Sequence, residues 1–204
     1  PANVFFLNTA LTVLLTFLVY GLGSLLSNRR AGLTGVLLLG TIPLFAIMAS
    51  SGHFDILNLV MLGLGVLFAF LYLERPGDIR MMVLVFTLIL FAQVRYENAL
   101  YLLPFGLLIL VGWGTAGRVI LPFPAILAPL FFVLPTLHYR IILNQDLGLF
   151  QAGPSGRELT FSLDYAAENL VSAVRYLFSI GFDHPNSLLV SILGTLCAFF
   201  LLHY

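Results

Sequence analysis

The sequence predicts an all-α protein: a polytopic transmembrane bundle of about seven spans with an amphipathic helix on its outer interface. The first observation is composition, since 60% of the 204 residues are hydrophobic and 9% are charged. Soluble domains carry roughly 25% charged residues. The second is a series of long apolar runs separated by short polar joins. We therefore expect an integral, multi-pass protein of a plasma or inner membrane, with the lipid bilayer as its immediate partner.

The polar composition argues against several classes of function. Basic and acidic residues balance to a net charge of zero, which leaves no basic surface for nucleic acid. The single cysteine, Cys197, can form neither an internal disulfide nor a cysteine metal cluster, and we interpret it as a small buried apolar side chain. The sequence also lacks the common phosphate-loop, dinucleotide, zinc-protease and nucleophile-elbow motifs.

The apolar runs define the predicted spans. They lie at about residues 4–26, 31–49, 56–73, 81–94, 99–113, 119–137 and 187–204. If the crossings alternate, the first, third and fifth joins share one side, and these joins contain Arg29, Arg30, Arg75, Arg80 and Arg118. Short arginine-rich joins are typical of the cytoplasmic face. The opposite, extracytoplasmic side then receives most of the acids and histidines and becomes the functional face.

The two predicted spans around "RYEN" form a hairpin. A single helix over residues 81–113 would be about 50 Å long, against a hydrocarbon core of about 30 Å. Each arm of the hairpin is short, so the turn at Arg95–Asn98 should lie below the outer lipid surface. Charged residues at that depth are candidates for function, which singles out Arg95 and Glu97. The alternative is a structural role, in which these two side chains neutralise each other or bind the ends of neighbouring helices.

Further candidates lie on the same predicted face. Asp55 stands where the third span begins, so it either caps that helix or joins His53 in binding a polar head group or a divalent cation. Asn58, one turn later, is expected to bond across helices. After a proline-rich span, His138 and Arg140 either contact a phosphate or act as interfacial anchors.

A long polar segment, residues 138–186, is predicted to be an extracytoplasmic loop. Within it, residues from about 163 to 180 carry apolar side chains at helical spacing with polar ones opposite, which indicates an amphipathic helix on the membrane surface. This helix is either a lid over a recessed cavity or a connector packed on the bundle. The whole chain is one transmembrane domain, residues 1–204.

The order of these parts resembles a known family. An outer "GHFD" entering a span, the turn "ERPGD", a short helix leading to "RYE", a proline-rich span and a long outer segment are similar to the middle of GT-C type glycosyltransferases. The nearest families are the protein O-mannosyltransferase-like and aminoarabinose-transferase-like enzymes. The resemblance implies an inverting transfer of sugar from a polyprenyl-phosphate donor on the extracytoplasmic face. Several such enzymes use a divalent cation.

The resemblance also implies roles for particular residues. Arg95 and Arg140 would contact the lipid phosphate. The donor or acceptor cavity would be lined by His53, Asp55, Tyr96, Glu97 and His138. The family's catalytic base lies in an acidic first outer loop, whereas residues 1–28 carry no charge. We therefore expect the base upstream of Pro1, and the sequence itself predicts no metal site.

Two other functions stay open at this point. The chain could be a non-catalytic membrane subunit that packs against other membrane proteins, with structural charges. It could also be part of a transporter or lipid flippase, whose cavity charges line a path.

Overall fold

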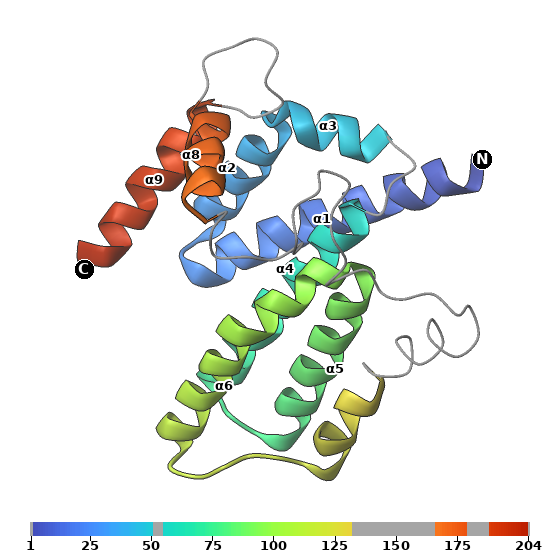
Figure 1. The fold of residues 1–204 in the computed structure, drawn as a ribbon, viewed down its shortest axis with the longest axis vertical. Helices are drawn as coiled ribbons and strands as arrows, with labels where there is room; N and C mark the ends of the chain where they lie inside the picture. Colours follow the sequence, from blue (N-terminus) through green and yellow to red (C-terminus); the bar gives the residue numbers. More distant parts are fainter. Residues whose placement is uncertain (1, 51–54, 132–165, 179–187, 204) are drawn as a thin grey trace.

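The computed structural model of the protein describes residues 2–50, 55–131, 166–178 and 188–203. The described residues form helices and connecting turns, with no strand among them, so the all-α prediction is confirmed. A further helical stretch covers residues 123–131. The other elements, in chain order, are α1 (Ala2–Leu26), α2 (Arg29–Gly40), α3 (Pro43–Ser50), α4 (Asp55–Glu74), α5 (Asp78–Val94), the 3-10 helix η1 (Tyr96–Tyr101), α6 (Leu102–Ala116), α8 (Ala166–Leu177) and α9 (Leu188–His203) (Figure 1).

Three segments of the described chain are long and apolar enough to cross a membrane. They are Phe5–Leu26, Asp55–Glu74 and Asn98–Ala116, and a fourth is added if the bent pair α2 and α3 forms one span. Seven separate crossings are therefore not confirmed. The predicted span 81–94 corresponds to α5, whose 17 residues reach about 26 Å, less than the roughly 30 Å of hydrocarbon. The predicted span 119–137 lies partly outside the described residues.

The predicted span 31–49 is broken in the structure. α2 ends at Gly40, and α3 begins at Pro43 after a bend of 73°. Proline lacks an N–H donor and suits the first turn of a helix, so Pro43 starts a new helix rather than continuing the old one. The Thr41 hydroxyl donates to the Leu38 carbonyl at 2.7 Å, which satisfies one carbonyl at the open end of α2.

α4, α5 and α6 form a three-helix layer whose contact surface is apolar (Figure 1). Tyr72 of α4 is fully buried against α6. The Tyr72 ring occupies the place where a side chain at Gly112 would project, so only glycine permits this contact. The Tyr72 hydroxyl lies beside Trp113, whose indole N–H already donates to the Ile120 carbonyl at 3.0 Å.

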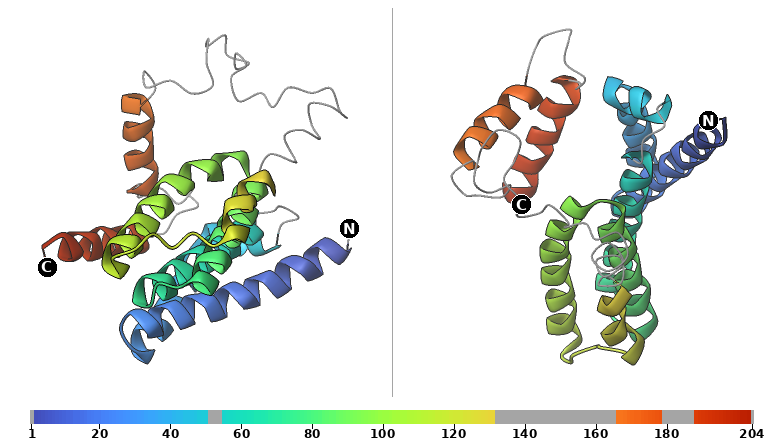
Figure 2. Two further views of the ribbon diagram at one scale, coloured as in Figure 1. Left: turned by 90° about the horizontal axis from the view of Figure 1, so that it is seen from below. Right: turned by 45° about the vertical axis from the view of Figure 1, so that its right-hand side comes forward.

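α1 packs against α2 and against the first half of α4 (Figures 1 and 2). Leu15 and Leu18 of α1 meet Ile56 and Val60 of α4 in a second buried cluster. The contact between α1 and α2 depends on small residues, because a Cβ on Gly23 would lie 2.8 Å from the Cα of Gly32. Such close backbone approach is typical of helix pairs in membranes.

α8 falls within the predicted range 163–180 and presents exposed apolar residues such as Leu170 and Val174. α8 and α9 make few contacts with the other described helices. Cys197 of α9 is consequently exposed, which corrects the expectation that it is buried. Burial within the protein needs a packing partner, whereas an apolar helix in a bilayer can present such a residue to lipid.

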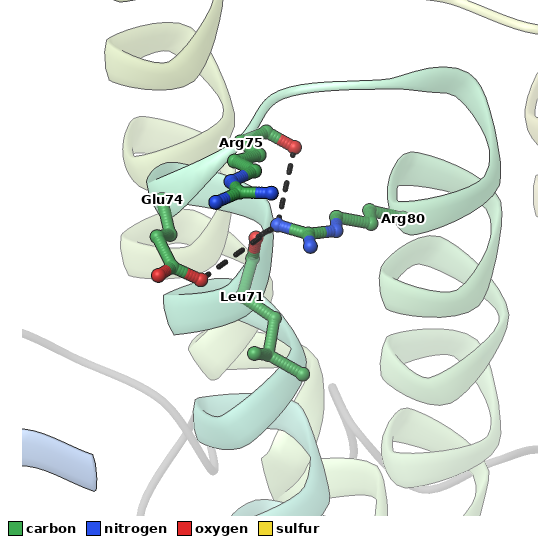
Figure 3. A network of polar contacts seen from close by, with 4 residues as sticks. All are labelled: Leu71, Glu74, Arg75 and Arg80. Atoms are coloured by element: carbon green, nitrogen blue, oxygen red, sulfur yellow. Dashed lines mark hydrogen bonds and ion pairs between the residues drawn. The ribbon is translucent and has the colours of Figure 1, made fainter.

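One end of the three-helix layer carries arginines, and we call it the arginine end. There the Arg80 guanidinium reaches from the first turn of α5 to the last turn of α4, donating to the carbonyls of Leu71 and Arg75 and lying 3.9 Å from the Glu74 carboxylate (Figure 3). The last carbonyls of a helix lack donors within the helix. Arg80 therefore caps α4 while joining it to α5.

Candidate functional site

The turn between α5 and α6 lies at the opposite end of the layer. α5 stops at Val94, and Arg95 adopts an extended conformation (φ −145°, ψ 142°) that reverses the chain. η1 follows, with the Asn98 N–H donating to the Arg95 carbonyl at 3.1 Å. The predicted interruption of the apolar run at Arg95–Asn98 is therefore present, and it leaves the Arg95 side chain half exposed.

Arg95 forms an ion pair with Asp55. The Arg95 Nη1 lies 3.2 Å from the Asp55 Oδ1, and the two side chains are 48% and 20% exposed. Asp55 is in the first turn of α4, where its negative charge also complements the helix dipole. The Asp55 carboxylate thus complements the dipole of α4 and also binds Arg95 in the facing turn. The alternative partner of Arg95 from the sequence, Glu97, has a side chain outside the described part of the structure.

A pair of amides lies next to this ion pair. The Asn98 Nδ2 donates to the Asn58 Oδ1 at 2.6 Å and to the Phe91 carbonyl at 2.8 Å. Asn98 is 2% exposed, so these bonds are shielded from solvent. The prediction that Asn58 bonds across helices is confirmed. Asn98 was not singled out from the sequence, where the only signal was an amide in an apolar hairpin turn.

The ion pair and the amide pair have the same residue spacing along α4 and along the turn. Asp55 and Asn58 are three residues apart and therefore lie on one face of α4. Arg95 and Asn98 have the same spacing across the turn into η1. The ion pair and the amide pair thus stand as successive contacts between α4 and the turn, and we call these four residues the polar cluster.

The remaining predicted site residues are not tested by the geometry. His53, His138 and Arg140 lie outside the described residues. The backbones of Tyr96 and Glu97 belong to η1, next to Arg95, but their side chains are not described. The structure therefore brings Asp55 and Arg95 together and adds Asn58 and Asn98.

The polar cluster does not fit a divalent cation. Within the described residues no three metal-binding side chains of the His, Cys, Asp and Glu types gather at one place. Asp55 is the carboxylate of the cluster, and it is committed to Arg95. Magnesium and calcium need several oxygen ligands, whereas the cluster otherwise offers amides that already bond to each other.

The cluster is better suited to an anion. A guanidinium carries five N–H donors in a planar fork, and one Arg95 nitrogen faces Asp55. Among the described residues no further partner of the Arg95 guanidinium is found. Arg95 can thus stay paired with Asp55 while its exposed N–H groups bind phosphate or carboxylate oxygens.

No family model matches the chain, and neither the curated proteins nor the solved structures contain a match.

Proposed function

We propose that the protein is a membrane glycosyltransferase, or the donor-binding part of one, that transfers a sugar from a polyprenyl-phosphate donor on the extracytoplasmic face. The observation that carries the proposal is the half-exposed Arg95 guanidinium, held by Asp55 at a turn between two apolar helices. A charge in that setting suits a lipid-linked substrate, because the tail of such a substrate holds its phosphate near membrane depth.

The chemistry of transfer gives Arg95 a specific role. When the sugar leaves its lipid carrier, negative charge develops on the departing phosphate, and a preorganised cation stabilises that charge. Asp55 fixes the guanidinium without consuming all its donors. The amide pair Asn58–Asn98 holds the turn against α4 and so limits movement of Arg95.

Other residues complete the proposed site through their position in the sequence. Tyr96 and Glu97 follow Arg95 directly, and His53 lies two residues before Asp55. In the proposal they line the donor or acceptor cavity, together with His138. Arg140 supplies a second contact to the phosphate. No residue is assigned as the catalytic base, because Asp55 is paired with Arg95.

The proposal is tested by replacing Arg95 with alanine and with lysine. The purified protein is reconstituted in liposomes with a polyprenyl-phosphate donor carrying a labelled sugar, and release of the polyprenyl phosphate is measured. We expect R95A to lower turnover by about 100-fold or more, which is the usual effect of losing a preorganised charge-stabilising donor. R95K should retain part of the activity, because it keeps the charge but lacks the planar fork.

The matched control is Arg175→Ala, which removes an exposed arginine of α8. Its turnover should equal that of the unchanged protein. Normal turnover in R95A would contradict the proposed role of Arg95. If no donor is consumed and other membrane proteins copurify in fixed ratio, the chain is an accessory subunit. Gradient-driven uptake of a solute into the liposomes would instead identify a transporter.

A further inference from the structure

An apolar groove of about 680 Å³ runs along α6. Its walls are entirely apolar, and its volume falls within the range of about 300–1,000 Å³ that is typical of ligand sites. The groove opens outward, since Leu103 and Leu107 are 72% and 64% exposed. The lining residues that matter here are Met81, Leu103, Gly106, Leu107, Trp113 and Leu121.

The groove follows the helix for much of its length. From Leu103 to Trp113 it covers ten residue steps, or about 15 Å at the rise of an α-helix. An apolar groove of this length matches an extended hydrocarbon chain. Gly106 contributes to the groove because no atom lies within 4 Å of the place where its Cβ would project.

A loop after α6 lies at the arginine end of the groove. Gly117, with φ 64°, ends α6 in a left-handed conformation, and the Trp113 indole donates to the Ile120 carbonyl at 3.0 Å. The loop runs from the end of α6 across the arginine end to the helical stretch 123–131 (Figure 1), and Leu121 on it contributes to the groove wall. Arg118 lies on this loop, between two residues that line the groove, Trp113 and Leu121.

The two arginines near this end of the groove, Arg80 and Arg118, differ in their contacts. Arg80, adjacent to the groove residue Met81, is bound to the end of α4 and to Glu74. Arg118 is exposed, and no ion pair is found for it within the described residues. Trp113 is a further sign of a lipid head-group region, because its amphipathic ring favours the membrane–water interface. At the other end, Arg95 belongs to the polar cluster, where the proposed function places the phosphate of the sugar donor.

We propose that this groove binds one acyl chain of an anionic phospholipid, with the phosphate of that lipid at Arg118. The groove follows α6, and its proposed phosphate contact, Arg118, lies beyond the end of α6 that is opposite to the polar cluster. The lipid would be a structural partner drawn from the bilayer, not the sugar donor. Its recognition combines burial of hydrocarbon along α6 with one charge contact at the loop after Gly117.

The test is native mass spectrometry of the purified protein in detergent, with phosphatidylglycerol or phosphatidylcholine of the same acyl chains as probes. Phosphatidylglycerol should bind more tightly. Arg118→Gln should weaken its binding about fivefold, the effect of roughly 1 kcal/mol for one basic residue near an anionic lipid. Phosphatidylcholine binding should stay within twofold, because the trimethylammonium group of its head group offsets much of the attraction between its phosphate and Arg118.

A second pair of variants tests the groove itself. Gly106→Leu fills the groove and should reduce binding of both lipids, while Gly114→Leu, at an open glycine of the same helix outside the groove, should not. The proposal is overturned if these two variants bind alike, or if R118Q leaves phosphatidylglycerol binding unchanged. It is also overturned if Arg95→Gln, rather than R118Q, weakens binding, since the head group would then lie at the other end.

Discussion

Replacing Asn98 with alanine removes a buried side chain that joins α4, the last turn of α5 and η1. Its Nδ2 makes two hydrogen bonds, to the Asn58 Oδ1 at 2.6 Å and to the Phe91 carbonyl at 2.8 Å. A buried amide–carbonyl bond contributes about 1 kcal/mol net, and an interhelical side-chain bond in a membrane protein averages about 0.6 kcal/mol. We therefore expect N98A to lower the free energy of unfolding by about 1.5–2 kcal/mol.

Asn58→Ala is the matched comparison, because it removes only the interhelical bond. It should cost about 0.6 kcal/mol, roughly 1 kcal/mol less than N98A. The double variant should lose less than the sum of the two single losses, and the difference measures the amide–amide bond. Asn98→Asp should be worse than N98A, because it directs a carboxylate oxygen at two acceptor oxygens.

The assay is reversible unfolding in mixed micelles by titration with a denaturing detergent. Trp113, the single tryptophan, reports the transition by fluorescence from within α6. Equal losses for N98A and N58A would refute the role of the Phe91 contact. A loss below about 0.5 kcal/mol for N98A, the range of ordinary surface substitutions, would refute the argument that this amide fixes the turn.

Further predictions concern packing and capping, all measured by the same unfolding titration. Gly112→Ala should cost about 1–3 kcal/mol by overpacking against Tyr72, while Gly114→Ala, with open space around it, should not destabilise. Gly23→Ala should cost about 1–3 kcal/mol by forcing α1 and α2 apart. Arg80→Ala should cost about 0.5–1.5 kcal/mol through the lost cap on α4, with the Glu74 pair adding little at 3.9 Å.

The charged half of the polar cluster could be predicted from the sequence. Asp55 and Arg95 were conspicuous because a charge is costly in an apolar run, so each required an explanation. Asn58 could also be predicted to form an interhelical bond, because an uncharged polar side chain in an apolar span needs a hydrogen-bond partner. What the sequence could not supply was the pairing, since Arg95 had an acidic neighbour two positions away in Glu97 and meets Asp55 only because α4 and α5 pack side by side.

Two features were missed for identifiable physical reasons. Asn98 carries no charge, and its partner lies 40 residues away, so no local pattern reveals that it is buried. The bend between α2 and α3 had a local signal, Gly40 followed by Pro43, but hydropathy averages over such a break and reads the run as one span. Hydropathy alone therefore does not separate a continuous span from a pair of helices that meet at a bend.

In the proposed function, the amide pair of the polar cluster contributes to stability and the ion pair to binding. The amide pair is neutral, with Asn98 buried and Asn58 partly buried, so it can hold the turn to α4 without the desolvation cost of a buried charge. The ion pair lies nearer the surface, where Arg95 is 48% exposed. A fully buried pair would have no donor left for a ligand, and a fully exposed one would be mobile and weak. An arginine anchored on one side and open on the other is what binding a lipid phosphate requires, and its anchoring depends on the amide pair below it.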